Sequence, residues 1–506
     1  MNSVRTSFVQ MTRLDPLMLS LFPFVTLAQA TPAPLFPPPT KVPAQELVIP
    51  REALPAQETL QIQEIFQPQE VRPLPGQLDT VPVLNSNSPE VVQSEGILIS
   101  TFPPIGKDVP SAHLNYAFQG RFDIFSHHIA RVSSGQPRTL FHGILLNNPT
   151  SQPVKVEVLQ GASYTTRPDA LFISLPSYVE DPQGRVYAGP GSRVVNDLLR
   201  GRRQGFLPRE IILQPGENQM LINLPIPVAG APGSNGRSTL LRLRSTGSVY
   251  AASLAMYAPI KDGRERPPTL EEWQTLLFKS GLAGPRDIPP TPPGSNVVRV
   301  FYGRVAGVAV GSQWEAKLTD NPKSEVLTIP KRGRAFSYGL STLYRGTLGT
   351  GQIQSAKLLA RYPDTAYQAH GNYGIQYSLS LPLHNPAKQP QTVTLAIQTP
   401  LKDDRNKGGL LFYNPPENRV FFRGPVRIRY TDDNGSTQTR FVHVTQHRGQ
   451  QGEPLLTLTL PAGAHRLVQV DLLYPPDSTP PQVLTVQTLD QTVGVTASPT
   501  NTSSSP

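Results

Sequence analysis

Short segments with strictly alternating apolar and polar residues, punctuated by Pro and Gly, most limit what this chain can fold into. The alternation is clear at Val154–Val158, Leu241–Arg244 and Val426–Tyr430, and its period of two is that of a half-buried β-strand. Asn434-Gly435 is typical of a hairpin turn. The 56 prolines among 506 residues are about twice the usual share. Short strands with such punctuation predict a mainly β fold built from β-sandwiches.

Several short motifs occur twice, in the same order along the chain. This order indicates a diverged internal duplication. We therefore expect two related immunoglobulin-like β-sandwich domains, residues 81–262 and 294–492, each larger than a minimal domain of ~100 residues. The paired motifs are Ala112–Ala117 with Ala369–Gly374, Asn148–Pro153 with Asn385–Pro390, Arg185–Tyr187 with Arg419–Phe421, and Leu213–Gly216 with Leu460–Gly463.

The two ends of the chain have a different composition. Residues 1–30 resemble a secretory signal peptide, with an apolar run at Leu17–Leu27 and a small-x-small cleavage site at Ala28-Gln29-Ala30. Residues 31–80 are rich in proline, which predicts a disordered, extended arm. Residues 493–506 are rich in Ser, Thr and Pro, which predicts a disordered tail.

Residues 263–293 are expected to form a linker that contains a short helix. Thr269 and Glu272 have the spacing of a capping box, and Gly281 is a suitable end. This amphipathic helix is expected to pack on one or both domains and to set their relative angle. A second short helix is expected near Ser192–Leu199, inside the first domain.

The charge and the absence of cysteine restrict the possible functions. With no cysteine, the chain has no disulfide, thiolate metal site, cysteine nucleophile or lipid-modified cysteine. A net charge of +10 on an exported protein suits anionic polysaccharide, peptidoglycan or envelope proteins as partners. No membrane span is expected after signal cleavage. The basic clusters are short and lack interleaved aromatics, so we expect no nucleic-acid partner; they are Arg200, Arg202 and Arg203, and Lys331, Arg332 and Arg334.

No catalytic motif is present in the sequence, and we expect no catalytic residue, cofactor or metal. Gly339–Leu343 lacks the second glycine of a nucleophile elbow. Two histidine groups, His127 with His128 and His443 with His447, have no third ligand at a suitable spacing. They are interpreted as structural histidines.

The repeated Ala-His-x-Asn-Tyr motif allows two interpretations. It could form two equivalent recognition sites, in which His and Asn bind hydroxyl groups and Tyr supplies a stacking face. It could also define a turn, with Asn satisfying backbone groups and Tyr filling the core. The candidate binding residues are His113, Asn115, Tyr116, His370, Asn372 and Tyr373.

Several longer stretches resemble a known family of exported cyanobacterial proteins, defined by domain of unknown function 3370. The stretches are Leu74–Glu90, Ala112–Ala117, Tyr187–Arg193 and Arg237–Arg242, and the resemblance extends from Leu74 to about Thr488. It implies a cyanobacterial origin and an envelope or extracellular setting. It implies no catalytic residue, because the family carries no assigned activity.

These observations favour an exported, non-enzymatic protein, located in the periplasm or outside the cell, that binds surface polysaccharide or envelope proteins. One alternative is a carbohydrate-active or wall-modifying enzyme, with its site in the loop between Gln160 and Pro208 or at the domain interface. Another is an assembly or chaperone-like factor that offers a sheet edge to client strands.

Overall fold

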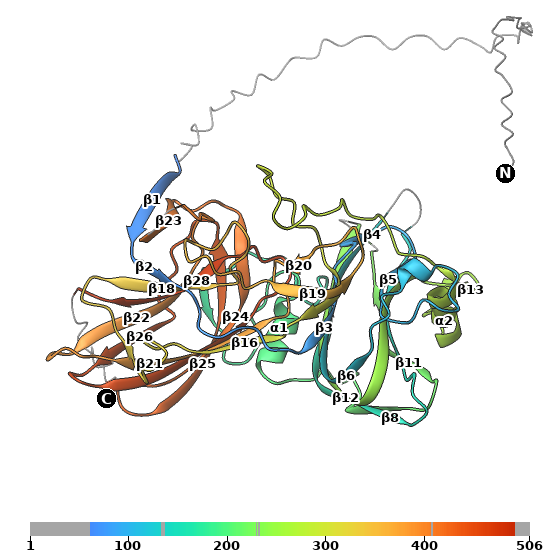
Figure 1. Ribbon diagram of the computed structural model, residues 1–506, viewed down its shortest axis with the longest axis horizontal. Coiled ribbons are helices and arrows are strands. Elements are labelled where there is room, and N and C mark those ends of the chain that lie inside the picture. Colours follow the sequence, from blue (N-terminus) through green and yellow to red (C-terminus); the bar gives the residue numbers. More distant parts are fainter. Residues whose placement is uncertain (1–60, 133–136, 229, 231–232, 406–407, 491–506) are drawn as a thin grey trace, which may run out of the picture. The chain divides into compact units, whose positions relative to one another are not determined.

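The computed structural model describes residues 61–490, apart from 133–136, 229, 231–232 and 406–407. Within those residues the chain forms 28 β-strands, two α-helices and one 3₁₀ helix, η1 (Pro110–Ala112). The prediction of a mainly β fold is therefore confirmed (Figure 1). The predicted signal peptide and tail, and the first part of the predicted arm, lie outside the described residues.

A twelve-stranded sheet is organised around one long strand, β12 (Ser234–Tyr257). The first half of β12 pairs with β6 and β8, and its second half pairs with β5 and β7, so the sheet has two layers. Apolar side chains from both layers pack together. The first layer also contains β10 (Glu210–Leu213), β8 (Val154–Thr165), β6 (Phe118–Arg131), β4 (Val91–Val92), β3 (Pro82–Ser86), β15 (Ala306–Val310), β19 (Ala356–Arg361) and β20 (Gln368–Ala369). The second contains β11 (Asn218–Ile226), β7 (Leu140–Asn147) and β5 (Gly96–Ser100).

A seven-stranded sheet and a five-stranded sheet share a second apolar core. Burial alternates along strands of the seven-stranded sheet such as Gln313–Lys317 and Gln376–His384, as a period of two predicts, whereas the central strands of the five-stranded sheet are buried almost throughout. Residues Val420–Thr431 and Thr437–His447 form the predicted hairpin. The seven-stranded sheet contains β16 (Gln313–Lys317), β17 (Leu327–Thr328), β21 (Gln376–His384), β27 (His465–Leu473), β24 (Val420–Thr431), β25 (Thr437–His447) and β9 (Tyr178–Glu180). The five-stranded sheet contains β2 (Glu70–Arg72), β18 (Ala335–Leu340), β28 (Gln482–Thr488), β22 (Gln391–Gln398) and β26 (Leu456–Leu460).

Strands pair across the boundaries expected from the sequence. The predicted arm contains β2, which pairs with β18, and β1 (Gln63–Pro68), which pairs with β23 (Gly409–Asn414). The arm is therefore ordered from residue 61 onward, contrary to the expectation for that part. Strand β9 comes from the first half of the chain but joins β25, whereas β15 comes from the second half but joins β3. Alternation reveals that a strand exists, but it does not reveal which sheet the strand enters.

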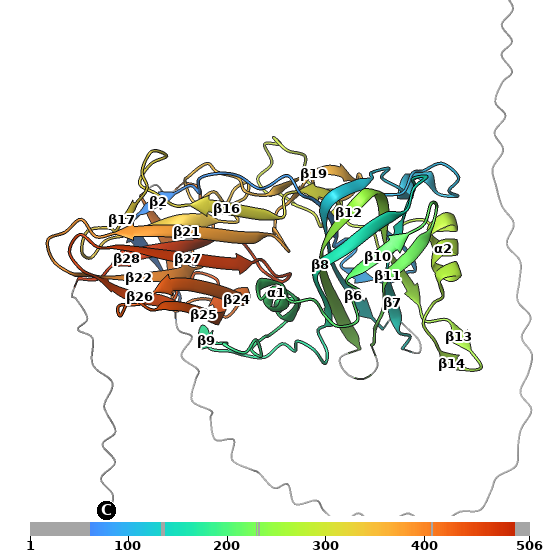
Figure 2. The same cartoon turned by 90° about the horizontal axis from the view of Figure 1, so that it is seen from below.

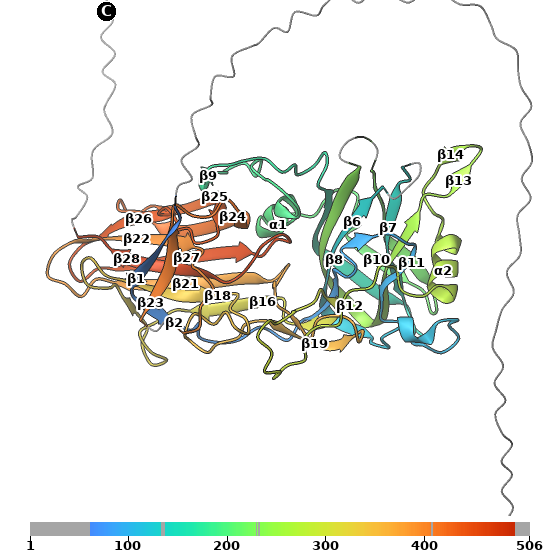
Figure 3. The ribbon, with the colours of Figure 1, turned by 90° about the horizontal axis from the view of Figure 1, so that it is seen from above.

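Both predicted helices are confirmed. Helix α2 (Leu270–Lys279) begins with the capping box of Thr269 and Glu272, and it packs against β5, β11 and β12 through buried Trp273. Helix α1 (Ser192–Leu199) lies between β8 and β24 (Figures 2 and 3). The helix in contact with both sets of sheets is therefore α1, not the linker helix α2. Neither α-helix in the described part of the chain has the length and apolarity that a bilayer span needs. The remaining small ribbon joins β13 (Ile260–Lys261) to β14 (Arg264–Glu265).

Candidate functional site

The first Ala-His-x-Asn-Tyr motif follows η1 and lies beside the end of β5. Burial lowers the pKa of His113 to about 4, and its Nδ1 is 2.8 Å from the hydroxyl oxygen of Ser100. Asn115 is exposed and has a left-handed backbone, with φ 53°. Tyr116 is half-buried and its ring packs edge-on against Phe118. His113 and Tyr116 therefore have partners inside the fold.

The second motif follows β20 and is more deeply buried. The ring of His370 lies 4.6 Å from that of Tyr302, and burial lowers the pKa of His370 to about 4. Asn372, with φ 49°, is 1% exposed, and its side chain holds the backbone of Gln354 and Ala356. The hydroxyl of Tyr373 donates to a backbone carbonyl, that of Ser478, at 3.0 Å. The contacts of this second motif are those of a structural turn.

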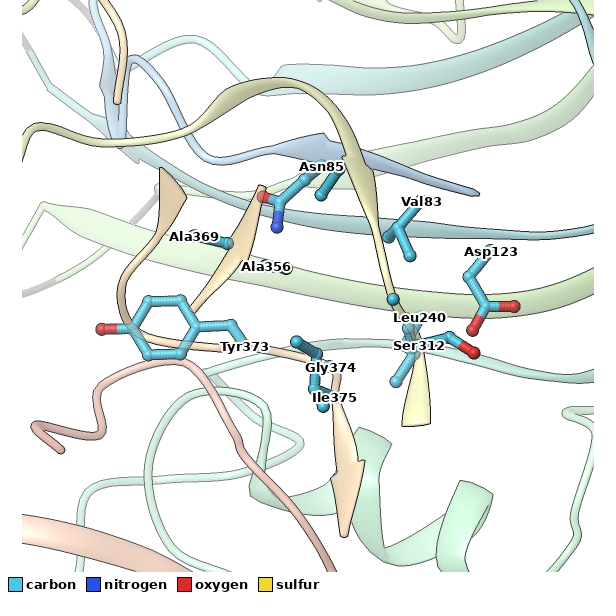
Figure 4. A pocket seen from close by; sticks show the side chains of 12 residues that line it. Val83, Asn85, Asp123, Leu240, Ser312, Ala356, Ala369, Tyr373, Gly374 and Ile375 are labelled. Atoms are coloured by element: carbon cyan, nitrogen blue, oxygen red, sulfur yellow. The ribbon is translucent and has the colours of Figure 1, made fainter. Parts of the chain in front are cut away.

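Tyr373 borders an enclosed cavity between strands β3, β6 and β12 and the turn after β20 (Figure 4). The ring lies at one end, and its hydroxyl points away from the other labelled side chains. The cavity volume is about 10 Å³, close to the minimum for one water molecule. Two buried acceptor atoms on its wall, Asn85 Oδ1 and Asp123 Oδ2, have no hydrogen-bond partner among the described residues. The cavity is therefore too small for a saccharide or a cofactor.

Larger pockets lie beside the loop that follows α1. Gly201 has φ +73°, a left-handed conformation that commonly ends a helix at glycine. The loop then runs along β8, where Gln204 N donates to Gly161 O at 2.8 Å and Val158 N donates to Arg209 O at 2.8 Å. Leu207, 3% exposed, anchors the loop in the core. These contacts fix Arg202, Arg203 and Arg209 on the surface beside β8.

Two pockets share Arg203 as a common wall. The first, here called the arginine pocket, has a volume of about 410 Å³, and the second, the neighbouring pocket, has a volume of about 490 Å³. Both volumes fall within the ~300–1,000 Å³ typical of small-molecule sites. The arginine pocket is lined by Tyr164, Gly184, Arg193, Asp197, Arg202, Arg203, Gln204 and Gly205. The neighbouring pocket is lined by Glu157, Val158, Leu159, Gly201, Arg203, Arg209 and Glu210.

The arginine pocket has an excess of positive charge, with three arginines and one carboxylate on its wall. Asp197 accepts a hydrogen bond from the Tyr164 hydroxyl at 2.8 Å and pairs with Arg202 at 3.2 Å. Burial, together with this bond to Asp197, raises the pKa of Tyr164 to about 12, so its phenol stays a neutral donor. Arg193 lies over the Tyr164 ring at 4.2 Å and pairs with Asp169 at 3.6 Å.

Arg203 differs from Arg200 and Arg202 of its cluster because no carboxylate within the described residues forms an ion pair with it. Its Nη1 atom is buried and has no hydrogen-bond partner there. Arg200, predicted in the same basic cluster, instead points inward, pairs with Asp181 at 3.4 Å and stacks on Phe441. The sequence therefore located the cluster, but it could not show that Arg200 is structural and that Arg203 is available to a ligand.

Arg193, Arg209 and Tyr164 are pocket residues that sequence reasoning missed. Arg209 lies seven positions after the cluster's Arg202, and no motif connects it with Tyr164 on β8. The available signal was the placement of several arginines just after a short helix. The arginine pocket lies between Gln160 and Pro208, where the enzyme alternative placed its site, whereas most residues of the neighbouring pocket lie outside that range.

The two predicted histidine groups do not form a metal centre in the structure. His127 and His128 are buried in β6 and hydrogen-bond to Ser238 and Ser86, respectively. His443 is fully buried in β25. Across the described part of the chain, no three side chains of His, Asp or Glu gather in a way that could hold a metal ion.

Comparison with known proteins identifies a family but no characterised relative. The family model described as "Protein of unknown function (DUF3370)" matches residues 69–488. No curated protein matches the sequence.

The solved structures that align include Lac15 from a marine microbial metagenome, at 12% identity over 74% of this chain with a TM-score of 0.11. This chain spans about half of Lac15, 53% of its length. Others are the pro-11S globulin of pumpkin, at 10% identity over 79% of this chain and 86% of the globulin with a TM-score of 0.10, and the 11S allergen of Cocos nucifera, at 11% identity over 79% and 90% with a TM-score of 0.09. Such low scores support no statement about fold or role.

Proposed function

The chain belongs to the DUF3370 family. From this membership and from the geometry of the pockets, we propose that it is an exported, non-enzymatic protein of the cell envelope or extracellular space. We propose that it binds anionic polysaccharide. The observation that carries the proposal is Arg203, a guanidinium without a carboxylate partner that borders both pockets. Arginine binds carboxylate and sulfate groups through two parallel hydrogen bonds. The net charge of +10 would attract such a chain over longer distances.

The other pocket residues suit a saccharide rather than a small inorganic anion. The two pockets meet at Arg203, and each has a volume above 400 Å³, which is large enough for a sugar unit. Leu159 of β8, on the wall of the neighbouring pocket, is 39% exposed. Apolar side chains next to charged ones fit the apolar face and the acidic group of a uronate or a sulfated sugar.

The carboxylates of these pockets favour binding over catalysis. Glycoside hydrolysis needs one carboxylic acid with a raised pKa. Lys155 lies 2.8 Å from Glu157, and this hydrogen bond lowers the pKa of Glu157. Glu210 lies 3.9 Å from the same lysine, and Asp197 is held by Tyr164 and Arg202. The geometry therefore supports a binding site better than an acid–base pair.

We further propose that the two pairs of sheet layers are immunoglobulin-like sandwiches related by duplication. Asn115 and Asn372, at the same position of the repeated motif, have φ angles of 53° and 49°. Asn148 and Asn385 make the same contacts in their turns. In each case the side-chain oxygen accepts from the backbone N–H two residues later, at 2.9 Å and 3.0 Å. The side-chain amide donates to the carbonyl four residues later and to the end of a neighbouring strand.

The proposal is tested by binding of the mature chain, residues 31–506, to a polyuronate, a sulfated polysaccharide and isolated peptidoglycan, at 0.05 and 0.15 M salt. Arg203→Gln should weaken binding at least tenfold, because a charge-assisted hydrogen bond contributes about 1.5–3 kcal/mol. Arg264→Gln removes the same charge from the exposed β13–β14 ribbon and serves as the matched control.

If Arg203→Gln and Arg264→Gln lowered the affinity by the same small factor, the interaction would be a nonspecific attraction between charges. That result would contradict the proposed site. Release of sugar fragments by the native chain, abolished by Arg203→Gln, would instead favour the enzyme alternative. A preference for envelope proteins over every polysaccharide would replace the proposed ligand class.

A further inference from the structure

The outward face of the seven-stranded sheet contains a further hollow, here called the polar groove, with a volume of about 220 Å³. It crosses the four adjacent strands β16, β21, β27 and β24. Every residue that lines it is polar except Leu379. A solvent-facing sheet face is usually polar, but in this hollow donors and acceptors from four strands face one space.

The register of the strands explains why the polar side chains meet. Glu315 lies opposite Ser378, Ser378 lies opposite Asp471, and Asp471 lies opposite Arg427. Residues directly opposite each other across paired strands point to the same face. A second row runs parallel, from Ser380 through Gln469 to Arg429. The intervening residues, such as Tyr377 and Val470, point into the core.

The charges of the groove cancel, unlike those of the arginine pocket. Asp471 is buried, and its Oδ2 accepts from Arg427 Nε at 3.1 Å and from Arg429 Nη2 at 3.3 Å. Glu315 is exposed on the opposite side of the groove. Two arginines and two carboxylates give no net charge, so the groove has no electrostatic preference for a charged ligand.

One atom of the groove lacks a partner. Arg429 Nε is buried and forms no hydrogen bond within the described residues, and an unpaired buried donor is costly. The amide nitrogens of Gln376 and Gln469 already bond to serine hydroxyls, at 2.8 Å and 3.4 Å. A ligand hydroxyl can both donate and accept, so it matches this mixture of groups better than a carboxylate or a cation would.

Helix α1 connects the groove with the arginine pocket. Its residues Arg193 and Asp197 line that pocket, and its last residue, Leu199, accepts a hydrogen bond from Arg427 Nη1 of the groove at 3.3 Å. Both sites therefore border the same eight-residue helix, which lies between β8 and β24 (Figure 2).

From this geometry we infer that the polar groove binds the hydroxyl groups of an uncharged sugar unit and forms a second subsite for the polysaccharide. The inference rests on the proposed function, because it assigns a neutral unit of that ligand to the groove while the arginine pocket takes the acidic unit. No aromatic side chain lines the groove, so hydrogen bonding alone holds the sugar and the isolated subsite binds weakly, with a Kd on the order of 1 mM.

Saturation-transfer NMR on residues 31–506 tests the inference with cellohexaose, maltohexaose and a hexamer of N-acetylglucosamine as neutral probes. At least one probe should bind, and Glu315→Gln and Gln469→Ala should each reduce its affinity by threefold or more. Glu271→Gln, the same chemical change on the surface of α2, should leave the affinity unchanged. Thermal melting of each variant shows that the fold is retained.

Two crossed measurements separate this inference from the proposed function. Arg203→Gln should leave the neutral probe bound, whereas Glu315→Gln should leave the affinity for an acidic hexauronate within twofold. Absence of neutral binding with intact hexauronate binding would overturn the groove as a subsite and leave the proposed function standing. The groove would also be overturned as a subsite if Arg203→Gln abolished binding of the neutral probe while Glu315→Gln and Gln469→Ala did not. If the native chain bound the neutral probe but not the hexauronate, that result would contradict the proposed function but not the groove.

Discussion

Three histidines lie buried among serines in the twelve-stranded sheet, and their burial favours neutral rings. His128 Nδ1 donates to the carbonyl of Pro89 at 2.8 Å, and its Nε2 lies 2.8 Å from the hydroxyl oxygen of Ser86. The hydroxyl of Ser86 also contacts that of Ser253, which is 2.9 Å from His142 Nε2. The hydrogen-bond partners of these rings are serine hydroxyls and a backbone carbonyl, so a proton added to a ring would be a buried charge with no carboxylate bonded to it.

We expect these histidines to make the protein sensitive to mild acid. Burial lowers the pKa of His127 and of His128 to about 4 and that of His142 well below its usual value. The unfolded chain binds these protons near pH 6.5. Between pH 6.5 and about 4 the unfolded state therefore holds more protons, and the free energy of unfolding falls as the pH falls. Each histidine contributes up to ~1.4 kcal/mol per pH unit in that interval.

Urea unfolding at pH 7.0, 6.0 and 5.0 measures this dependence. Ordinary carboxyl groups remain ionised over most of this range, so histidine dominates the change. His127→Gln should make the decline with pH shallower, because it removes one of the buried histidines whose pKa is lowered. A free energy of unfolding that stays constant from pH 7.0 to pH 5.0 would contradict the prediction.

At the scale of the elements, two asparagines stabilise equivalent turns. Asn148 and Asn385 are both fully buried, and each fixes the turn that joins a pair of long strands, β7 to β8 and β21 to β22. Their amides donate to Leu213 O and Leu460 O, each at 3.0 Å. These bonds attach each turn to the end of a neighbouring strand.

Asn148→Ala and Asn385→Ala should each lower the free energy of unfolding by about 2–3 kcal/mol, because each leaves buried backbone groups without partners. The two losses should be similar if the turns are copies of one ancestral turn. Asn434→Ala, in the exposed hairpin turn between β24 and β25, should change the free energy by less than ~0.5 kcal/mol. Chemical denaturation of the three variants measures the differences. A loss at only one of the two turns would contradict the equivalence.

The sequence could predict that individual strands and helices exist, but it could not predict which strands pair. The capping box at Thr269 and the alternation at Val426–Tyr430 are local signals, and each predicted its element correctly. The partner of each strand depends on contacts distant in sequence, which alternation does not encode. Strand β9 joins β25 across more than 250 residues. The arginine pocket could not be predicted for the same reason. Tyr164 and Arg203 come together only because the loop pairs with β8.

At the scale of the whole molecule, the two halves of the chain complete each other's cores. Tyr362, from the second half, is 1% exposed in the core of the twelve-stranded sheet. Its hydroxyl donates to Ala112 O at 2.8 Å and accepts from Ser100 N at 3.1 Å. Strand β15, also from the second half, covers the edge of β3. In the opposite direction, Leu74 from the start of the chain enters the second core.

Because of this exchange, we expect residues 31–506 to unfold in one cooperative transition. A fragment of residues 31–293 should lack a sharp thermal transition, since it loses Tyr362 and leaves the edge of β3 and part of its core exposed. Circular dichroism melting and binding of a hydrophobic dye compare the two proteins. A fragment that melts within a few degrees of the whole chain would show independent domains and contradict this prediction.

A nicked chain tests the same point without removing any residue. Val298 is almost fully exposed, so a protease site inserted after it can be cut in the folded protein. The two pieces should remain together in gel filtration, because Tyr362, β15 and Leu74 bind each piece to the other's core. They should separate only in denaturant and at the midpoint of the intact protein's transition. Separation in plain buffer would mean that these contacts are too weak to join the halves, and the expected boundary at residues 263–293 would then divide two autonomous domains.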